Sequence, residues 1–149
     1  MKVLILGDIV GRPGRNFLKD ELEHFKQTNQ IELIIANGEN AAGGAGITAK
    51  TAKEILGSGV DAITLGDHVW DQMNFNREID DLQYVCRPAN LPDSNPGRDR
   101  LIIEKGGLKI GIFTVLGRTF MGPKVSCPFQ TASQMVQDLD AQTDIIIAE

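Results

Sequence analysis

The sequence predicts an α/β fold, and three features of the chain lead to this prediction. Short apolar runs typical of buried strands alternate with segments that carry apolar residues at helical spacing. The chain has 149 residues, close to the size of one ordinary domain. Its 42% of hydrophobic residues is enough for a sizeable core. We therefore expect one α/β domain that covers residues 1–149.

The expected strands follow from the apolar runs. KVLILG at residues 2–7 is continuously apolar, which suits a strand covered on both faces. Residues 100–116 read as a hairpin with Gly106 and Gly107 at its turn. The other expected strands are at 31–36, 61–66, 84–86 and 144–148, the last of them buried.

The expected helices lie between these strands, at residues 14–28, 48–57, 74–82 and 131–141. In the first of them, Leu18, Leu22 and Phe25 form one apolar stripe. Thr48 is the expected N-cap of the second helix, and the glycines at 57 and 59 are its stop signals. Residues 87–99 are rich in proline and glycine and predict a loop.

Composition narrows the class of protein. The net charge is −5, from 15 basic and 20 acidic residues, and no Lys/Arg cluster stands out in the sequence. This argues against a partner that is a nucleic-acid polymer, although a small phosphorylated ligand held by metals stays open. No apolar run approaches the roughly 20 residues that span a membrane, and the first residues do not resemble a signal peptide. Cys86 and Cys127 form no CxxC motif, so we expect reduced cysteines and a cytoplasmic protein.

The segment NGENAAGGAG at residues 37–46 is unusual for a loop between a strand and a helix. Such loops usually need about two to six residues, and this one is longer. Asn37, Glu39 and Asn40 supply three oxygen-bearing side chains, and four glycines and three alanines make up the rest of the loop. The segment is either a wide surface connection, or its oxygens converge on a ligand.

Acidic residues follow each of the first three expected strands: Asp8, Glu39 and Asp67, the last of them followed by His68. In an open α/β sheet, ligands bind in the crevice beyond the carboxyl ends of the strands. Crowded carboxylates repel one another, and a divalent cation removes this cost. Two cations that share one carboxylate would form a hydrolytic site that generates hydroxide near neutral pH. We expect Glu39 to be this shared ligand, brought over the sheet edge by a turn at the loop glycines.

Each of these residues also has a structural interpretation. Asp8 alone fits a turn, Glu39 alone fits a helix cap, and His68 alone fits a buried core histidine. Arg87 and Arg118 either reach a phosphate or have solvated or structural roles. The glycine spacing of GDIVGRPGR does not match GxGxxG and disfavours a dinucleotide-binding loop.

Five blocks in order resemble those of the YmdB-type calcineurin-like metallophosphoesterases: GDIVGRPGR, NGENAAGGAGIT, LGDHVWD, VCRPANLP and LGRTF. The resemblance covers essentially the whole chain. It implies an α/β/β/α sandwich with two divalent metal ions, usually iron or manganese, for which magnesium or zinc are alternatives. It also implies hydrolysis of phosphodiesters such as 2′,3′- or 3′,5′-cyclic mononucleotides.

The resemblance further implies roles for the matching positions. Asp8 would bind one metal with the help of Asn40, Glu39 would bridge both metals, and Asp67 would bind the second. His68 would be catalytic, by stabilising developing charge or protonating the leaving oxygen. In the last block, Arg118 is the candidate for substrate binding.

Two departures from the family pattern affect these expectations. The family block G-N-H reads Gly66-Asp67-His68 here, so an aspartate replaces the asparagine ligand and adds a negative charge. We expect tighter metal binding, weaker Lewis acidity and more repulsion of an anionic phosphate. The family's later histidine blocks, F-H-A-E and G-T-H-T-H-V, do not occur in the sequence up to Glu149.

We therefore expect a fold truncated after about half to two-thirds, in a fragment rather than a natural short product, with a metal site that is incomplete alone. We also expect a small phosphodiester substrate and a homo-oligomer. The alternative function is a non-catalytic module that binds a metal or a nucleotide, or serves in assembly.

Overall fold

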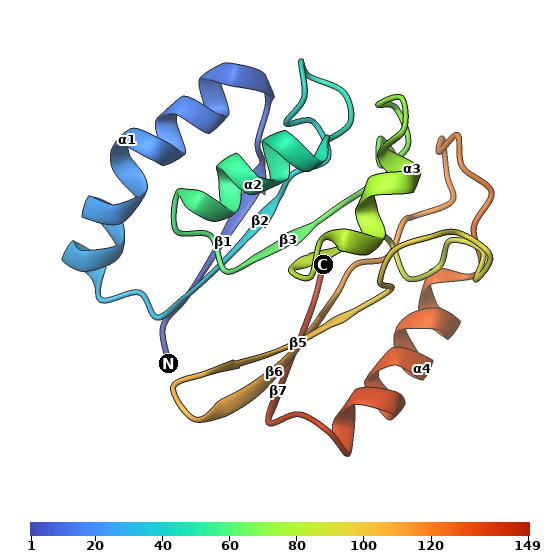
Figure 1. Cartoon of the computed structure of the whole chain (residues 1–149). Helices are drawn as coiled ribbons and strands as arrows, with labels where there is room; N and C mark the ends of the chain where they lie inside the picture. The colour runs from blue at the N-terminus through green and yellow to red at the C-terminus, as the bar shows by residue number, and fades with distance from the viewer.

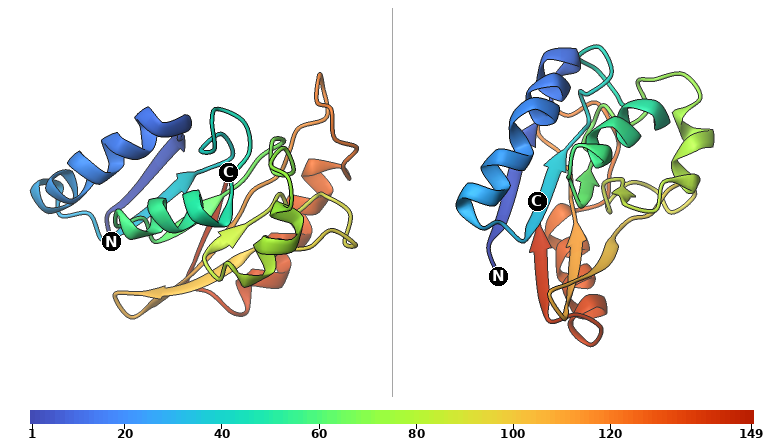
Figure 2. Two further views of the ribbon diagram at one scale, coloured as in Figure 1. Left: turned by 45° about the horizontal axis from the view of Figure 1, so that its top comes forward. Right: turned by 60° about the vertical axis from the view of Figure 1, so that its left-hand side comes forward.

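The computed structural model describes all residues from Met1 to Glu149 and has four layers. In Figure 1, α1 and α2 lie on one side of the strands and α4 lies on the other side. Two sheets occupy the middle, one of four strands and one of three. Figure 2 shows the same arrangement from two further directions. The expected α/β/β/α layering is therefore present.

The first sheet has the strand order β1-β2-β3-β4, and every pair is parallel. Its strands are β1 (Val3–Asp8), β2 (Leu33–Asn37), β3 (Ala62–Thr64) and β4 (Val85–Cys86). The connecting helices are α1 (Gly11–Asn29), α2 (Ala49–Gly57) and the short α3 (Phe75–Glu78), which continues as a 3-10 turn over Ile79–Asp81. Because the strands are parallel, their carboxyl ends all lie along one edge of the sheet.

The second sheet has the order β5-β6-β7. Its strands are β5 (Leu101–Lys105), β6 (Leu108–Phe113) and β7 (Ile145–Ala148), and α4 (Pro128–Asp140) connects the last two. The predicted hairpin is confirmed, since β5 pairs antiparallel with β6. At its turn, Gly106 and Gly107 both have positive φ, 60° and 78°, as a tight turn between strands requires. No helix is long and apolar enough to cross a membrane.

Each pair of neighbouring layers has its own apolar core. Along β2, Ile34 points toward α1 and α2, whereas Leu33 and Ile35 pack against the second sheet. This alternation is what a strand covered on both faces produces. Beyond the second sheet, Phe113 packs with residues of α4. Cys86 lies between the sheets, where burial raises the pKa of its thiol to about 12, and both cysteines are free.

Two strands are less covered than the sequence predicted. Ile5 on β1 is 56% exposed, because the three-stranded sheet packs over β2, β3 and β4 but not over β1. The predicted buried strand at 144–148 is β7, whose isoleucines are only half-buried and whose Ala148 is exposed, at the edge of the second sheet. A continuous apolar run indicates a strand that lies inside a domain, but not how many strands the facing sheet contains.

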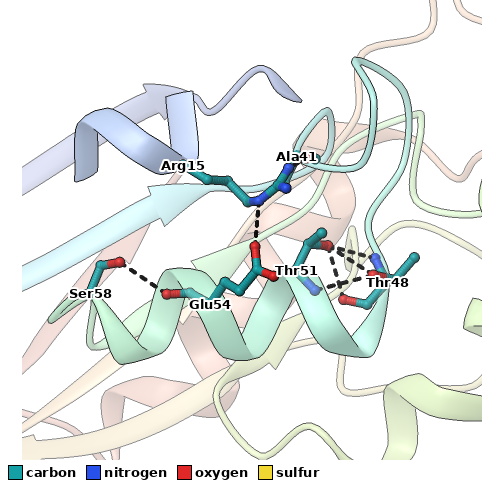
Figure 3. Close-up of polar contacts among 6 residues, drawn as sticks. All are labelled: Arg15, Ala41, Thr48, Thr51, Glu54 and Ser58. Atoms are coloured by element: carbon teal, nitrogen blue, oxygen red, sulfur yellow. Dashed lines mark hydrogen bonds and ion pairs between the residues drawn. The ribbon is translucent and has the colours of Figure 1, made fainter. Parts of the chain in front are cut away.

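The helices also differ in detail from the expectation. α1 begins at Gly11 rather than at residue 14, because Pro13 falls in the first turn, where no backbone N–H is needed. Phe25, expected on the buried stripe, is 48% exposed, while Leu18 and Leu22 are buried as predicted. Thr48 caps α2 as predicted: its side chain accepts a hydrogen bond from the amide of Thr51 at 3.1 Å (Figure 3).

Asn90 holds the long segment that follows β6. Its side-chain amide donates to the carbonyl oxygens of Leu116 and Ser126, at 2.8 and 3.2 Å, and its oxygen accepts from the amide of Leu116 at 2.9 Å.

We expect Asn90→Ala to lower the free energy of unfolding by about 1–3 kcal/mol, because these buried groups lose their partners. Urea unfolding measures the change. Asn95→Ala is the control, since that side chain makes no hydrogen bond, and an equal loss in both variants would contradict the prediction.

Candidate metal and phosphoester site

The register of the first sheet brings three strand ends together. Asp8 at the end of β1 is paired with Asn37 at the end of β2, and Asn37 is paired with Thr64 at the end of β3. The acidic residues that the sequence analysis singled out therefore leave neighbouring strands at one edge. Asp67 follows β3 after two further residues and is half-buried.

Glu39 connects two of these strand ends. Its amide donates to Asn37 Oδ1 at 3.1 Å, and its Oε2 accepts a hydrogen bond from the amide of His68 at 3.2 Å. Burial raises the pKa of Glu39, and the nearby charges of Asp67 and Asp8 raise it further. The hydrogen bond from the His68 amide lowers it, but the net pKa is raised. The site therefore disfavours negative charge on Glu39 and would accept a cation readily.

Gly66 makes room for this carboxylate. A Cβ atom at position 66 would overlap both carboxylate oxygens of Glu39. The backbone of Gly66 needs no positive φ, so the reason for a glycine here is space alone. In the sequence, this glycine is noticeable only as part of the LGDHVWD motif.

Asn40 has a free oxygen in a buried position. Its Nδ2 donates to Asp8 Oδ2 at 2.8 Å, while its Oδ1 is buried without any hydrogen-bond partner. No other buried side-chain nitrogen or oxygen in the chain lacks a partner. Such an atom costs about 1–3 kcal/mol unless something satisfies it. A cation beside Asp8 and Asn40 would do so, because carboxylate and amide oxygens are ligands that hard divalent cations accept.

The residues present fit part of a metal centre. No three His, Cys, Asp or Glu side chains are grouped closely enough to hold a metal ion by themselves. Glu39 instead lies near both Asp67 and Asp8, and Asn40 contacts Asp8 through its amide nitrogen. The predicted ligands Asp8, Glu39, Asn40 and Asp67 therefore lie at one edge, and their roles as ligands stay predictions.

His68 is held by a residue that sequence analysis did not identify. Its Nδ1 lies 2.6 Å from Asp71 Oδ2, and its Nε2 lies 4.0 Å from Asp67 Oδ2. The side chain is 43% exposed, so it is not a buried core histidine. The hydrogen bond to Asp71 is the main reason why the pKa of His68 is raised. The only sequence signal for this pair is the spacing of three residues in HVWD.

The long loop after β2 turns as predicted. Gly43, Gly44 and Gly46 have φ values of 72°, 96° and 76°, which other residues rarely adopt. Two side chains that were not predicted hold the loop. Gln72 Nε2 donates to the carbonyl oxygens of Ala42 and Ala45, at 3.2 and 2.6 Å, and Arg15 donates to the carbonyl of Ala41.

The two arginines singled out in the sequence differ in their surroundings. Arg87 is buried and donates to the carbonyl oxygens of Pro88 and Pro96, so its role is structural. Arg118 is exposed in the segment after β6 and makes no ion pair, and its contact with substrate stays a prediction. Glu149, which was not predicted, accepts a hydrogen bond from Asn37 Nδ2 at 3.4 Å and brings a carboxylate from the second sheet to this edge.

Comparison with known proteins identifies the family. The model of the YmdB-like protein family matches residues 4–149. The chain belongs to this family. It is 36% identical over 149 residues to the 2′,3′-cyclic-nucleotide 2′-phosphodiesterase of Bacillus subtilis (strain 168), and the match covers all of the chain and 56% of that relative. The family resemblance inferred from the five sequence blocks is thereby confirmed.

Two solved structures are similar to this YmdB-like chain. A hypothetical protein from Thermus thermophilus and a novel phosphatase from Mycoplasma pneumoniae both match with a TM-score of 0.88 and 31% identity. Each match covers 99% of the chain, and 56% and 54% of those proteins respectively. The calcineurin-like sandwich predicted from the sequence is confirmed, and the chain spans about half the length of these relatives.

The His68–Asp71 pair can be tested in the metal-free protein. We expect Asp71→Asn to lower the pKa of His68, because the imidazolium loses its carboxylate partner. His68 of the variant would therefore lose its proton at lower pH than His68 of the parent. NMR titration of the imidazole protons measures both pKa values. His24, the only other histidine, is the internal control, and an unchanged His68 pKa would contradict the pairing.

Proposed function

We propose that this chain is part of a metal-dependent phosphodiesterase that acts on phosphodiesters such as 2′,3′- or 3′,5′-cyclic mononucleotides. The observation that carries the proposal is the unpartnered Asn40 Oδ1 beside Asp8, at the edge where Glu39 and Asp67 also lie. Membership in the YmdB-like family and the name of the Bacillus subtilis relative support the same reaction.

Four oxygen donors would hold two divalent cations. Asp8 and Asn40 would bind the first, Asp67 the second, and Glu39 both. The family resemblance leads us to expect iron or manganese, with magnesium and zinc as alternatives, and we expect a complete centre to need further ligands besides these four. When bound, the cations would act as Lewis acids toward the phosphoryl group and lower the pKa of the attacking water.

The electrostatics of the edge support cation binding. The raised pKa of Glu39 means that its proton is retained to higher pH than for an ordinary glutamate. A cation would compete with this proton, so metal affinity should increase as the pH rises through the pKa of Glu39. The same cation would offset the repulsion between Glu39, Asp67 and Asp8.

His68 is the proposed general acid. Asp71 fixes the imidazole through Nδ1, which leaves Nε2 as the atom able to donate a proton to the leaving oxygen. Because Asp71 raises the pKa of His68, the protonated form persists to higher pH. We therefore expect this step to weaken as the pH rises past that raised pKa. Asp71 is a positioning residue, since it acts through His68.

The other sequence-based expectations are the cytoplasmic location, the homo-oligomer and the contact of Arg118 with substrate. They stay predictions. The cytoplasmic location accords with the two free cysteines.

Metal content and hydrolysis of bis-p-nitrophenyl phosphate test the proposed function. The measurement compares the 149-residue chain with any longer polypeptide that the gene encodes past Glu149. We expect about two metals and turnover only in the longer form. In the longer form, Asn40→Ala should lower the affinity for Mn²⁺ about tenfold or more, whereas Asn95→Ala should leave it unchanged. His68→Ala should lower kcat by about 10²–10⁴.

Two outcomes would correct the proposal. Absence of metal binding in both forms would make the acidic edge structural and favour a non-catalytic module. Turnover by the 149-residue chain would keep the phosphodiesterase but refute the incomplete site.

Asp67 provides a separate prediction, because the family motif has asparagine at this position. We expect Asp67→Asn to raise kcat toward phosphodiesters, since loss of one negative charge strengthens Lewis acidity and reduces repulsion of the phosphate. Metal affinity should fall at the same time. Steady-state kinetics at saturating Mn²⁺ measure the effect, with Asp93→Asn, an exposed loop residue, as the control. A lower kcat in Asp67→Asn would refute the inference.

A further inference from the structure

A polar groove lies on the helical face of the first sheet, between α1 and α2. Its volume is about 530 Å³, and no hydrophobic residue lines it. Five of the chain's 15 basic residues line this groove: Arg12, Arg15, Lys19, Lys50 and Lys53. We call these residues the basic groove. The sequence did not reveal this cluster, because its members come from two helices and the two groups are more than thirty residues apart in the chain.

Helical spacing explains how the basic groove forms. Arg12, Arg15 and Lys19 recur at intervals of three and four residues, so they lie on one face of α1. Lys50 and Lys53 are three residues apart, so they lie on one face of α2. Figure 1 shows the two helices side by side over the sheet. Residues of both helices line the groove. From Arg12 to Lys19 the wall is about 10 Å long.

Most of this positive charge has no partner. Glu54 is the only acid that lines the groove, and it pairs with Arg15 at 2.7 Å (Figure 3). Lys19, Lys50 and Lys53 make no ion pair and no side-chain hydrogen bond, and neither does Arg12. Four unpaired cations around one hollow attract a multivalent anion, in a chain whose net charge is −5.

The lining also limits what the anion can be. No aromatic residue and no other hydrophobic residue lines the groove, so a nucleobase has no aromatic side chain to stack on. The groove therefore offers charge and hydrogen-bond donors without a surface for a base or an acyl chain. A linear chain of phosphates, which carries several charges along a short length, matches the two facing rows of cations.

We propose that the basic groove is an anion site that binds the phosphate chain of an oligophosphate. The site is separate from the acidic edge, since it lies on the helices and contains none of the proposed metal ligands. One residue joins the two regions: Arg15 lines the groove and also donates to the carbonyl of Ala41, next to Asn40. The proposal does not depend on the phosphodiesterase activity, because it is tested without metal or substrate.

Calorimetric titration of the metal-free chain with sodium tripolyphosphate tests the proposal. We expect binding that weakens as salt is raised, and that falls about tenfold or more in the double variant Lys50→Gln/Lys53→Gln. The matched control is Lys109→Gln/Lys124→Gln, which removes the same charge from exposed positions outside the groove. Circular dichroism shows whether each variant is folded.

Two further measurements locate the binding site of the anion and identify which part of the anion is recognised. Tripolyphosphate should shift the backbone amide NMR signals of α1 and α2, and leave those of Glu39 and His68 unchanged. ATP should bind about as tightly as tripolyphosphate, because its base finds no aromatic partner in the groove, and inorganic phosphate should bind more weakly. No binding at low salt, equal losses in the two double variants, or shifts centred on Glu39 would each overturn the proposal. Binding of ATP about tenfold tighter than tripolyphosphate would overturn recognition of the phosphate chain alone.

Discussion

The candidate site depends on one steric constraint, which is that the Glu39 carboxylate fills the space where a side chain at position 66 would be. This places a charged group from the β2 loop against the backbone that follows β3, within reach of the His68 amide. Glu39 reaches this position two residues after β2 ends, and the loop then turns through the left-handed glycines 43, 44 and 46 before α2 begins.

The hydrogen bonds at this edge indicate different roles for its polar residues. Asp8 and Asn40 form a pair that leaves one buried amide oxygen without a partner, and this unsatisfied oxygen favours a cation. His68 and Asp71 form a second pair, in which the carboxylate fixes the imidazole. Gln72 contacts only backbone carbonyls, and Arg15 reaches the backbone carbonyl of Ala41, so both hold the loop.

Two charged regions of the molecule have opposite signs, and both contact the loop that follows β2. Acids gather at the carboxyl ends of the parallel strands, whereas the basic groove lies between the helices that cover the sheet. Arg15 contacts both the groove and the backbone of the loop. The low overall charge of the chain conceals this separation, because composition averages over both regions.

The sequence by itself determined the alternation of strands and helices, the loop turn at Gly43, Gly44 and Gly46, and the family. These are consequences of local periodicity and backbone preference, or of ordered motifs. Only the tertiary structure decided that Ile5 is exposed, that Asp71 partners His68, and that two helices combine their cations in one groove. Each depends on which elements pack side by side, and the pattern within a single segment carries no information about its neighbours in space.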